Sequence, residues 1–561
     1  MGLYEELRKY GEGDTYPYHM PGHKRKAFDF LPEGFVGIDI TEIDGFDNLH
    51  HAEGIIKEAQ DFAASVCGSD KAYFLVGGSS AGVLAAISAA VPYGGKLLIV
   101  RNAHGSAYNA MGLRGIEPVY LFPEINPKLG FCEAVKPEKI REVLSLNREA
   151  RAVFIVSPTY EGRVAKVREI ADIVHGYGLP LIVDEAHGAH LPFARGLEGY
   201  GESAVNAGAD LVIQSTHKTL PAPTQTAILH LNGSRIDKRT LEKYLRAYQS
   251  SSPSYPLMAG IDGAVRYMAG EGVERLREMR DRFRELTERV NRECRTISVI
   301  PAGYTGSYKG SAADFAGAER ENDRGDGCFN GRDLLHDIGK LVIFPCDRYY
   351  LADGENSGKR ATRGSAENHE NKLNNGERIS GKMIADMLRR DFSIETEMSC
   401  ERYCLAMFTV SDGADAYERM YNALKRIDDK LVGNRGRGEG VSENIVSHEG
   451  HSQGEIKPCK DEVSIENYEA DFNTEPEIAI PYPMTWEMKT EKCPLDSSAG
   501  RIAGEMIGIY PPGTPLLVPG ERITDEHVTL LRRYISEGLN VIGIYRELAA
   551  GQTVIQIEVI S

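Results

Sequence analysis

Short apolar runs alternate with helical patterns between residues 70 and 231. The runs, with the polar residues that end them, are AYFLV (72–76), KLLIV (96–100), AVFIVSP (152–158), LPLIVDEAH (179–187), ADLVIQSTHK (210–218) and TAILHL (226–231). Helical patterns lie between them, as at 81–91 and 166–177. Continuous apolar strands separated by helices are buried on both faces, so the pattern predicts an α/β domain around a mainly parallel sheet.

The pattern changes after residue 231. The elements predicted there are a long amphipathic helix over 273–294, helices over 380–392 and 415–431, and a strand over 403–410. Three polar stretches interrupt this half of the chain, at 303–333, 352–379 and 433–475. We predict loops or disorder in them because their composition buries too little apolar surface to form a core.

These changes in texture divide the chain into five parts. The predicted division is an N-terminal segment (1–60), a large domain (61–295), a small α/β domain with polar insertions (296–432), a flexible linker (433–477) and a C-terminal domain (478–561).

Composition excludes several classes of protein. The chain has 561 residues and a net charge of −17, which argues against nonspecific nucleic-acid binding. No apolar stretch approaches the roughly 20 residues that span a bilayer, and the polar N-terminus lacks a signal-peptide core. We therefore expect no membrane partner and a cytoplasmic location. Nine cysteines without CxxC spacing predict reduced thiols, and SHEGH (447–451) is interpreted as linker, so no metal site is expected.

Polar clusters follow the predicted strands. They are GGSS (77–80), RNAH (101–104), DEAH (184–187) and STHK (215–218). In open α/β sheets, ligands bind beyond the carboxyl ends of the strands. Lys218 is unusual there, because partial burial lowers the pKa of a lysine and leaves a neutral amine that attacks aldehydes. The clusters therefore predict a site for an aldehyde cofactor.

Pyridoxal phosphate makes demands that these clusters meet. Glycines and serines at a helix N-terminus suit a phosphate, an acid at Asp184 suits the ring nitrogen, and His104 suits the ring face. Taken singly, each signal is weak: GGSS is usually a turn, and a lysine after a strand is usually solvated. The four clusters in this order favour the cofactor over those simpler interpretations.

Together these stretches resemble the Orn/Lys/Arg decarboxylase family of fold-type-I pyridoxal-phosphate enzymes. The resemblance is carried by PGHK (21–24), DITEIDGFDNLHHAEG (39–54), GGSSAG (77–82), RNAHGS (101–106), VDEAHGAHLPF (183–193), QSTHKTLPAPTQ (214–225), SSPSYPLMAGID (251–262) and PLDSSAGRIAGEMIGIYPPGTPLLVPGE (494–521). It implies an aminotransferase-like large domain with a mainly parallel seven-stranded sheet and smaller α/β C-terminal domains. The chain is similar to the short, biosynthetic-type form, because it begins almost at PGHK where longer forms carry a wing domain.

The resemblance also implies roles for individual residues. Lys218 would hold the cofactor covalently, Asp184 would bind its ring nitrogen and His104 would stack on the ring. Residues that would hold the phosphate or lie beside the cofactor are Gly78, Ser79, Ser80, His187, Ser215 and His217. In a homodimer or larger homo-oligomer, Ser251 and Ser252 would reach the neighbouring subunit's site. The alternative for these two serines is an ordinary Ser/Pro turn.

The implied reaction is α-decarboxylation of a basic amino acid in polyamine biosynthesis, with arginine favoured over lysine and ornithine. Either His217 or Lys218 would return the proton to Cα. Glu521 is a candidate counter-ion for the distal cation of the substrate, with an exposed turn carboxylate as the alternative. Other possible functions are a different fold-type-I reaction (transamination, aldol or lyase chemistry) and a non-catalytic relative, which product analysis and a test for bound cofactor distinguish.

Overall fold

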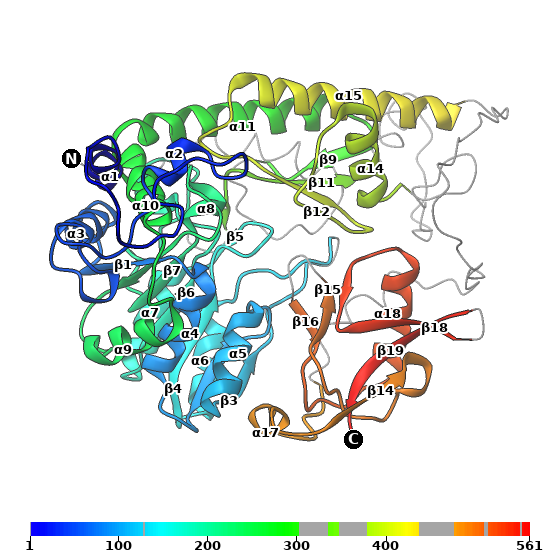
Figure 1. The fold of residues 1–561 in the computed structure, drawn as a ribbon. Coiled ribbons are helices and arrows are strands. Elements are labelled where there is room, and N and C mark those ends of the chain that lie inside the picture. The colour runs from blue at the N-terminus through cyan, green and yellow to red at the C-terminus, as the bar shows by residue number, and fades with distance from the viewer. Residues whose placement is uncertain are drawn as a thin grey trace.

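The structure is a computed structural model that describes residues 2–126, 129–301, 335–346, 379–436, 476–509, 514–549 and 552–561. Figure 1 shows a large lobe on one side and two smaller lobes on the other. The predictions of loops or disorder for 303–333 and for nearly all of 352–379 and 433–475, with SHEGH (447–451), lie outside the described residues.

The large lobe is built on a seven-stranded sheet in the order β1-β8-β7-β6-β4-β2-β3. Its strands are β1 (Lys71–Leu75), β2 (Lys96–Val100), β3 (Glu117–Leu121), β4 (Ala150–Val156), β6 (Leu181–Asp184), β7 (Leu211–Gln214) and β8 (Ala227–Leu231). Only β8 runs antiparallel to its neighbours in this sheet, β1 and β7. The prediction of a mainly parallel seven-stranded sheet is confirmed.

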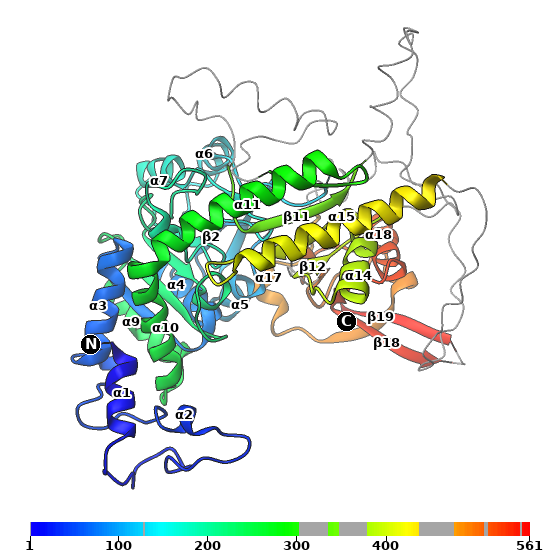
Figure 2. The same cartoon turned by 90° about the horizontal axis from the view of Figure 1, so that it is seen from above.

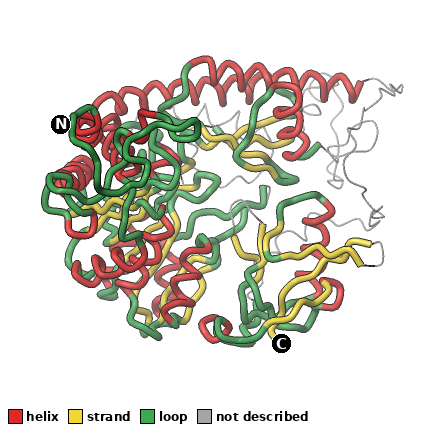
Figure 3. The backbone as a smooth tube through the Cα atoms, in the orientation of Figure 1, coloured by secondary structure: helices red, strands yellow, loops and turns green. Residues whose placement is uncertain are grey.

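Helices lie on both sides of these strands, as Figure 3 shows. They are α1 (Leu3–Gly11), α2 (Glu33–Val36), η1 (Leu49–His51), α3 (Ile55–Cys67), α4 (Gly78–Ala90), α5 (Gly105–Arg114), α6 (Pro137–Leu146), α7 (Val167–Gly176), η2 (Leu191–Ala194), α8 (Thr216–Thr219), α9 (Lys238–Tyr248) and α10 (Tyr255–Tyr267). In α7, Val167, Ile170 and Val174 are buried. This spacing places them on one face of the helix, which packs on the core.

The small lobe is a four-stranded antiparallel sheet in the order β12-β13-β11-β9. Its elements are η3 (Met268–Gly272), α11 (Val273–Glu293), β9 (Ile297–Val299), β11 (Lys340–Pro345), α14 (Gly381–Phe392), β12 (Met398–Ser399), β13 (Cys404–Met407) and α15 (Ala414–Gly436). Helices α11 and α15 run side by side along it (Figures 1 and 2). A two-stranded ribbon, β5 (Arg163–Val164) with β10 (Leu335–His336), joins this lobe to the large one.

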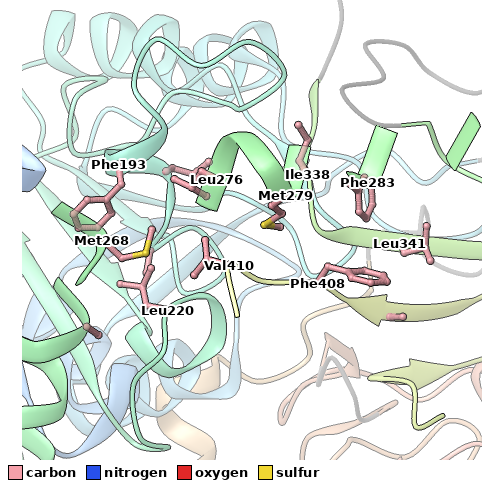
Figure 4. Close-up of a cluster of buried hydrophobic side chains, with 14 of the residues drawn as sticks. Phe193, Leu220, Met268, Leu276, Met279, Phe283, Ile338, Leu341, Phe408 and Val410 are labelled. Carbon is pink, nitrogen blue, oxygen red and sulfur yellow. The ribbon is translucent and has the colours of Figure 1, made fainter. Parts of the chain in front are cut away.

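One apolar cluster continues from the large lobe into the small lobe. Figure 4 shows Leu220, two residues after Lys218, beside Met268 and Val410, and the cluster continues through side chains of α11 to Ile338 and Leu341 around β11. Ile338 and Leu341 in that segment are 1% and 0% exposed. Residues 338–341 are therefore held in a dry interior, and whatever polar group lies among them is shielded from water.

The third lobe contains two three-stranded antiparallel sheets, β14-β19-β18 and β16-β15-β17. Its elements are α17 (Tyr482–Thr485), β14 (Thr490–Pro494), η6 (Leu495–Ser497), β15 (Ile507–Ile509), β16 (Thr514–Leu517), α18 (Asp525–Ser536), β17 (Val541–Ile542), β18 (Ile544–Ala549) and β19 (Gln552–Ile560). Trp486 lies directly on α5, because a side chain at Gly112 would overlap its indole ring.

The five-part domain division stays a prediction. Among the described residues, no helix is both long enough and apolar enough to cross a membrane.

Candidate functional site

The site lies where neighbouring parallel strands end. Strand β6 ends at Asp184, which is paired in register with Ile213 of β7. Strand β7 ends at Gln214, and the short helix α8 that follows carries Lys218. Since adjacent parallel strands end at the same edge of a sheet, the carboxylate and the amine come from one edge.

Lys218 is a partly buried amine. Its Nζ atom lies 3.2 Å from Nε2 of His187. Burial lowers the pKa of Lys218, and the negative charges of Asp184 and Glu397 oppose that shift. The site therefore favours the neutral amine more than water does, as the sequence predicted, and a neutral amine is the nucleophile toward an aldehyde.

Asp184 and His104 lie close enough to Lys218 to interact with it electrostatically. Asp184 is buried, and its Oδ1 accepts the backbone N–H of Ala186 at 3.1 Å. His104 caps α5, where its Nδ1 accepts the N–H of Ser106 at 3.2 Å. Desolvation lowers the pKa of His104, Asp184 raises it and Lys218 lowers it. The structure brings these three predicted residues into one electrostatic cluster.

The predicted phosphate donors lie at the first turn of α4 and beside α8. No side chain caps α4, whose N-cap is Gly77 and whose first residues are Gly78, Ser79 and Ser80. Gly78 has a φ of +72°, and a Cβ there would meet only a carbonyl oxygen of Gln225, at 3.8 Å. Nδ1 of His217 donates to the carbonyl of Thr226 at 2.8 Å. The first-turn N–H groups of α4 are thus left for an anion.

Ser215 tests whether the residues present fit pyridoxal phosphate. Its side chain is 0% exposed, and its Oγ has no hydrogen-bond partner in the part of the chain that the structure describes. A buried hydroxyl without a partner is costly. A phosphate oxygen would satisfy it, beside uncapped helix N–H groups and a lysine of lowered pKa. The donor set fits the cofactor.

His187 has a second partner that the sequence did not suggest. Its Nδ1 lies 2.7 Å from Nζ of Lys340, the first residue of β11. Burial lowers the pKa of Lys340 to about 8, and the charge of Lys218 lowers it as well. Burial, Lys340 and Lys218 lower the pKa of His187 well below its usual value. A neutral imidazole therefore lies between the partly buried amine of Lys218 and the buried amine of Lys340.

Tyr160 and Glu397 were also missed by the sequence. The hydroxyl of Tyr160 donates to Oε1 of Glu397 at 2.5 Å, and the Tyr160 ring lies edge-on to His187 with centroids 5.0 Å apart. Glu397 is exposed, yet its charge raises the pKa of Lys218. An accessible carboxylate therefore lies near the amine. No local pattern around TEMS marks it, because its importance comes from contacts across the fold.

Ser251 and Ser252 do not join this cluster within one chain. Both are exposed, and the neighbouring Ser250 carbonyl accepts from Nε2 of His50 at 2.7 Å. The N–H of Ser252 donates to Oγ of Ser250. Their role toward a neighbouring subunit stays a prediction.

Glu521 is neither an exposed turn residue nor an available counter-ion, so both interpretations of it are wrong. It is 2% exposed and accepts from Nη1 and Nη2 of Arg101 at 2.6 and 2.8 Å. It also accepts the N–H of Val518 at 2.8 Å. The carboxylate is occupied in fastening the third lobe to the end of β2. Its partner lies 420 residues away in the sequence, beyond what a local turn motif reveals.

No group of three His, Cys, Asp or Glu side chains in the described ranges is arranged to hold a metal ion.

Comparisons with known proteins agree with the geometry. The Orn/Lys/Arg decarboxylase major-domain profile matches residues 1–306, and the C-terminal-domain profile of the same family matches residues 463–539. The chain is 31% identical to the uncharacterized protein YaaO of Bacillus subtilis over 96% of this chain and 95% of that one. It is 28% identical to the arginine decarboxylase of Bacillus subtilis, with the same coverage.

A solved structure shows the same fold. Lysine decarboxylase A from Pseudomonas aeruginosa matches with a TM-score of 0.75 and 20% identity, over 100% of this chain and 80% of that one.

Proposed function

The chain belongs to the Orn/Lys/Arg decarboxylase family and is a pyridoxal-phosphate-dependent decarboxylase, and from that premise we propose that its substrate is arginine. The products would be agmatine and carbon dioxide. The observation that carries the proposal is the partly buried amine of Lys218, held 3.2 Å from His187 in a cluster with Asp184 and His104.

When bound, pyridoxal phosphate supplies an aldehyde carbon for amines to attack and a ring that accepts the electron pair left as carbon dioxide departs. Lys218 would anchor the cofactor through that carbon and give up its place to the substrate amine. Asp184 would keep a proton on the ring nitrogen, since a buried carboxylate stabilises a neighbouring cation. His104 would stack against the ring.

The phosphate would be held by the uncapped N–H groups at Gly78, Ser79 and Ser80 and by the hydroxyl of Ser215. His217 is oriented by its Nδ1–H bond to Thr226, which leaves Nε2 without a proton in the neutral ring. In that state Nε2 accepts rather than donates. Lys218, once released by the substrate, is then the better candidate to deliver a proton to Cα.

Arginine is favoured for two reasons. Relatives named arginine decarboxylase align over 92% to 96% of this chain, whereas the constitutive lysine and ornithine decarboxylases of Escherichia coli align over 88% and 49%. Glu397 also offers an accessible carboxylate beside the amine, held by the Tyr160 hydroxyl. A carboxylate accepts two parallel N–H bonds from a guanidinium, a geometry that an ammonium does not match.

The proposal extends to the setting of the reaction. We place the enzyme in the cytoplasm as a homodimer, with Ser251 and Ser252 reaching toward the partner's site, and its product in polyamine synthesis.

The test is a side-by-side assay of arginine, lysine and ornithine with the purified, cofactor-loaded chain. We expect the highest kcat/KM for arginine, with carbon dioxide and agmatine formed in equal amounts. Glu397→Gln should raise the KM for arginine about tenfold, as expected for losing an ion pair worth roughly 1.4 kcal/mol. A preference for lysine or ornithine, or a keto acid product, would overturn the proposal.

A further inference from the structure

His187 joins two lysines from different lobes of the molecule. Its Nε2 lies 3.2 Å from Nζ of Lys218, and its Nδ1 lies 2.7 Å from Nζ of Lys340. An imidazole holds one proton when neutral, so it donates at one nitrogen and accepts at the other. Lys218, His187 and Lys340 thus form one hydrogen-bonded chain, in which the hydrogen bonds can be donated in either of two directions.

The amine of Lys340 makes few other polar contacts. It is 2% exposed, and no carboxylate of the described residues forms an ion pair with its amine. Its other neighbours are the thioether of Met407, at 3.4 Å, and the Tyr160 ring, 5.7 Å away at its centroid. A buried lysine without an ion pair is expensive. A purely structural role would be served better by an apolar side chain.

Decarboxylation itself creates a need for such a lysine. Losing carbon dioxide from an amino acid leaves an electron pair at Cα, so each turnover consumes one proton. Lys218 is neutral when the substrate amine has displaced it. It needs a proton before it can act as an acid, and its amine is partly buried beside the apolar cluster that contains Leu220 (Figure 4).

We propose that Lys340 is a positioning residue that exchanges a proton with Lys218 through His187, so that the two amines hold one proton between them. In the first arrangement Lys340 is cationic and donates to Nδ1, while Nε2–H donates to the lone pair of Lys218. When Lys340 passes a proton to Nδ1 of His187 and Nε2 passes its proton to Lys218, Lys218 becomes cationic and Lys340 becomes neutral. No other bond is made or broken. This inference rests on the proposed decarboxylation.

Burial and the mutual repulsion of the two lysines and His187 disfavour a second proton, against the pull of the nearby carboxylates. Lys218 faces Asp184 and Glu397, and His187 faces His104 and His217 besides the two lysines. Lys340 faces Asp337, Glu397 and Glu161 as well as Lys218. Burial lowers the pKa of both lysines and of His187, so single occupancy is the expected state near neutral pH.

A small cavity that Lys340 helps to line offers a route for refilling. It has a volume of about 10 Å³ and is lined by Lys340, Thr219 and His190. Within the described ranges, Oγ1 of Thr219 and Nδ1 of His190 have no hydrogen-bond partner, while Nε2 of His190 lies 3.1 Å from Asp337. That volume is close to the least that holds one water. Polar side chains of Thr219 and His190 thus share this cavity with Lys340.

The first experiment uses the full chain without cofactor. Propionaldehyde and cyanoborohydride alkylate neutral amines, and mass spectrometry of the Lys218 peptide from pH 6 to 10 gives the neutral fraction. In Lys340→Met no second amine competes for the shared proton, so Lys218 holds it more of the time. Alkylation of Lys218 at pH 7 should therefore fall about tenfold, equal to a rise of one unit in its pKa. Lys340→Arg keeps a cation there and should remain within about twofold of wild type.

The second experiment separates charge from proton exchange in the cofactor-loaded enzyme. An arginine at 340 keeps the charge but does not release a proton, and His187→Gln breaks the chain without touching either lysine. We expect kcat to fall at least tenfold in Lys340→Met, Lys340→Arg and His187→Gln, with KM changed less than about threefold. Lys382→Met is the matched control: Lys382 donates to the Glu537 carbonyl and is not among the groups that act on Lys218, His187 or Lys340, so this variant should match wild type.

Two results would overturn the inference: an unchanged alkylation profile in Lys340→Met, or wild-type kcat in Lys340→Arg. The alkylation experiment needs no substrate. A chain that shows the expected alkylation shift but decarboxylates none of the three basic amino acids would refute the proposed function and leave the shared proton standing.

Discussion

The Arg101–Glu521 pair permits a sharp prediction about how the third lobe is held. The side chains are 7% and 2% exposed, and two N–H···O contacts of 2.6 and 2.8 Å join them. Glu521→Gln keeps the shape but leaves the Arg101 cation buried without a counter-ion. Removing one partner of a buried pair costs about 3–5 kcal/mol, because the other charge stays desolvated.

Trp486 provides the assay. It is the single tryptophan of the chain, and it lies on Gly112 of α5 where the third lobe meets the large lobe. Urea titration followed by its fluorescence therefore reports the release of that lobe. We expect Glu521→Gln to lower the free energy of this transition by about 3–5 kcal/mol, and the double variant Arg101→Met/Glu521→Gln to lose less than the two single losses combined.

A matched control lies within the same lobe. Arg532 and Asp496 are joined at 2.5 Å but are 57% and 68% exposed. Exposed pairs contribute at most about 1 kcal/mol, so Asp496→Asn should shift the transition far less. The reasoning fails if Asp496→Asn costs as much as Glu521→Gln, or if Glu521→Gln leaves the Trp486 transition where it is in wild type.

Three further predictions concern the site. Lys218→Ala should abolish decarboxylation and the visible absorbance of lysine-linked cofactor; absorbance that persists would contradict the assignment. Asp184→Asn should still bind cofactor but lower kcat by about 100-fold or more, and near-normal turnover would exclude that role. The pKa of Lys340, lowered to about 8 by burial, lies below its unfolded value of 10.5, so the unfolded chain binds more protons between those values and stability falls as pH drops from about 10.5 to about 8. Lys340→Met removes that cost, so its free energy of unfolding minus that of wild type should be about 3 kcal/mol higher (the variant relatively more stable) at pH 7 than at pH 10.5. An equal difference at both pH values would contradict the shift.

Much of the site was predictable because its residues follow strands that the chain encodes locally. The continuous apolar runs predicted strands β2, β4, β6, β7 and β8, and the residues after them predicted where Lys218 and Asp184 lie. Parallel neighbours end at one sheet edge whatever the rest of the fold does. Sequence alone therefore located the strand-end cluster and supported the fold class.

Contacts between distant segments were decided only by the tertiary structure. Lys340 meets His187 across 153 residues, Glu397 meets Tyr160 across 237, and Glu521 meets Arg101 across 420. A charged side chain in the sequence does not reveal whether it will be solvated, paired or buried, because its desolvation and its partner depend on packing that no local pattern contains. The sequence by itself thus determined the strands and the residues that end them. The packing of the lobes decided which charges surround them.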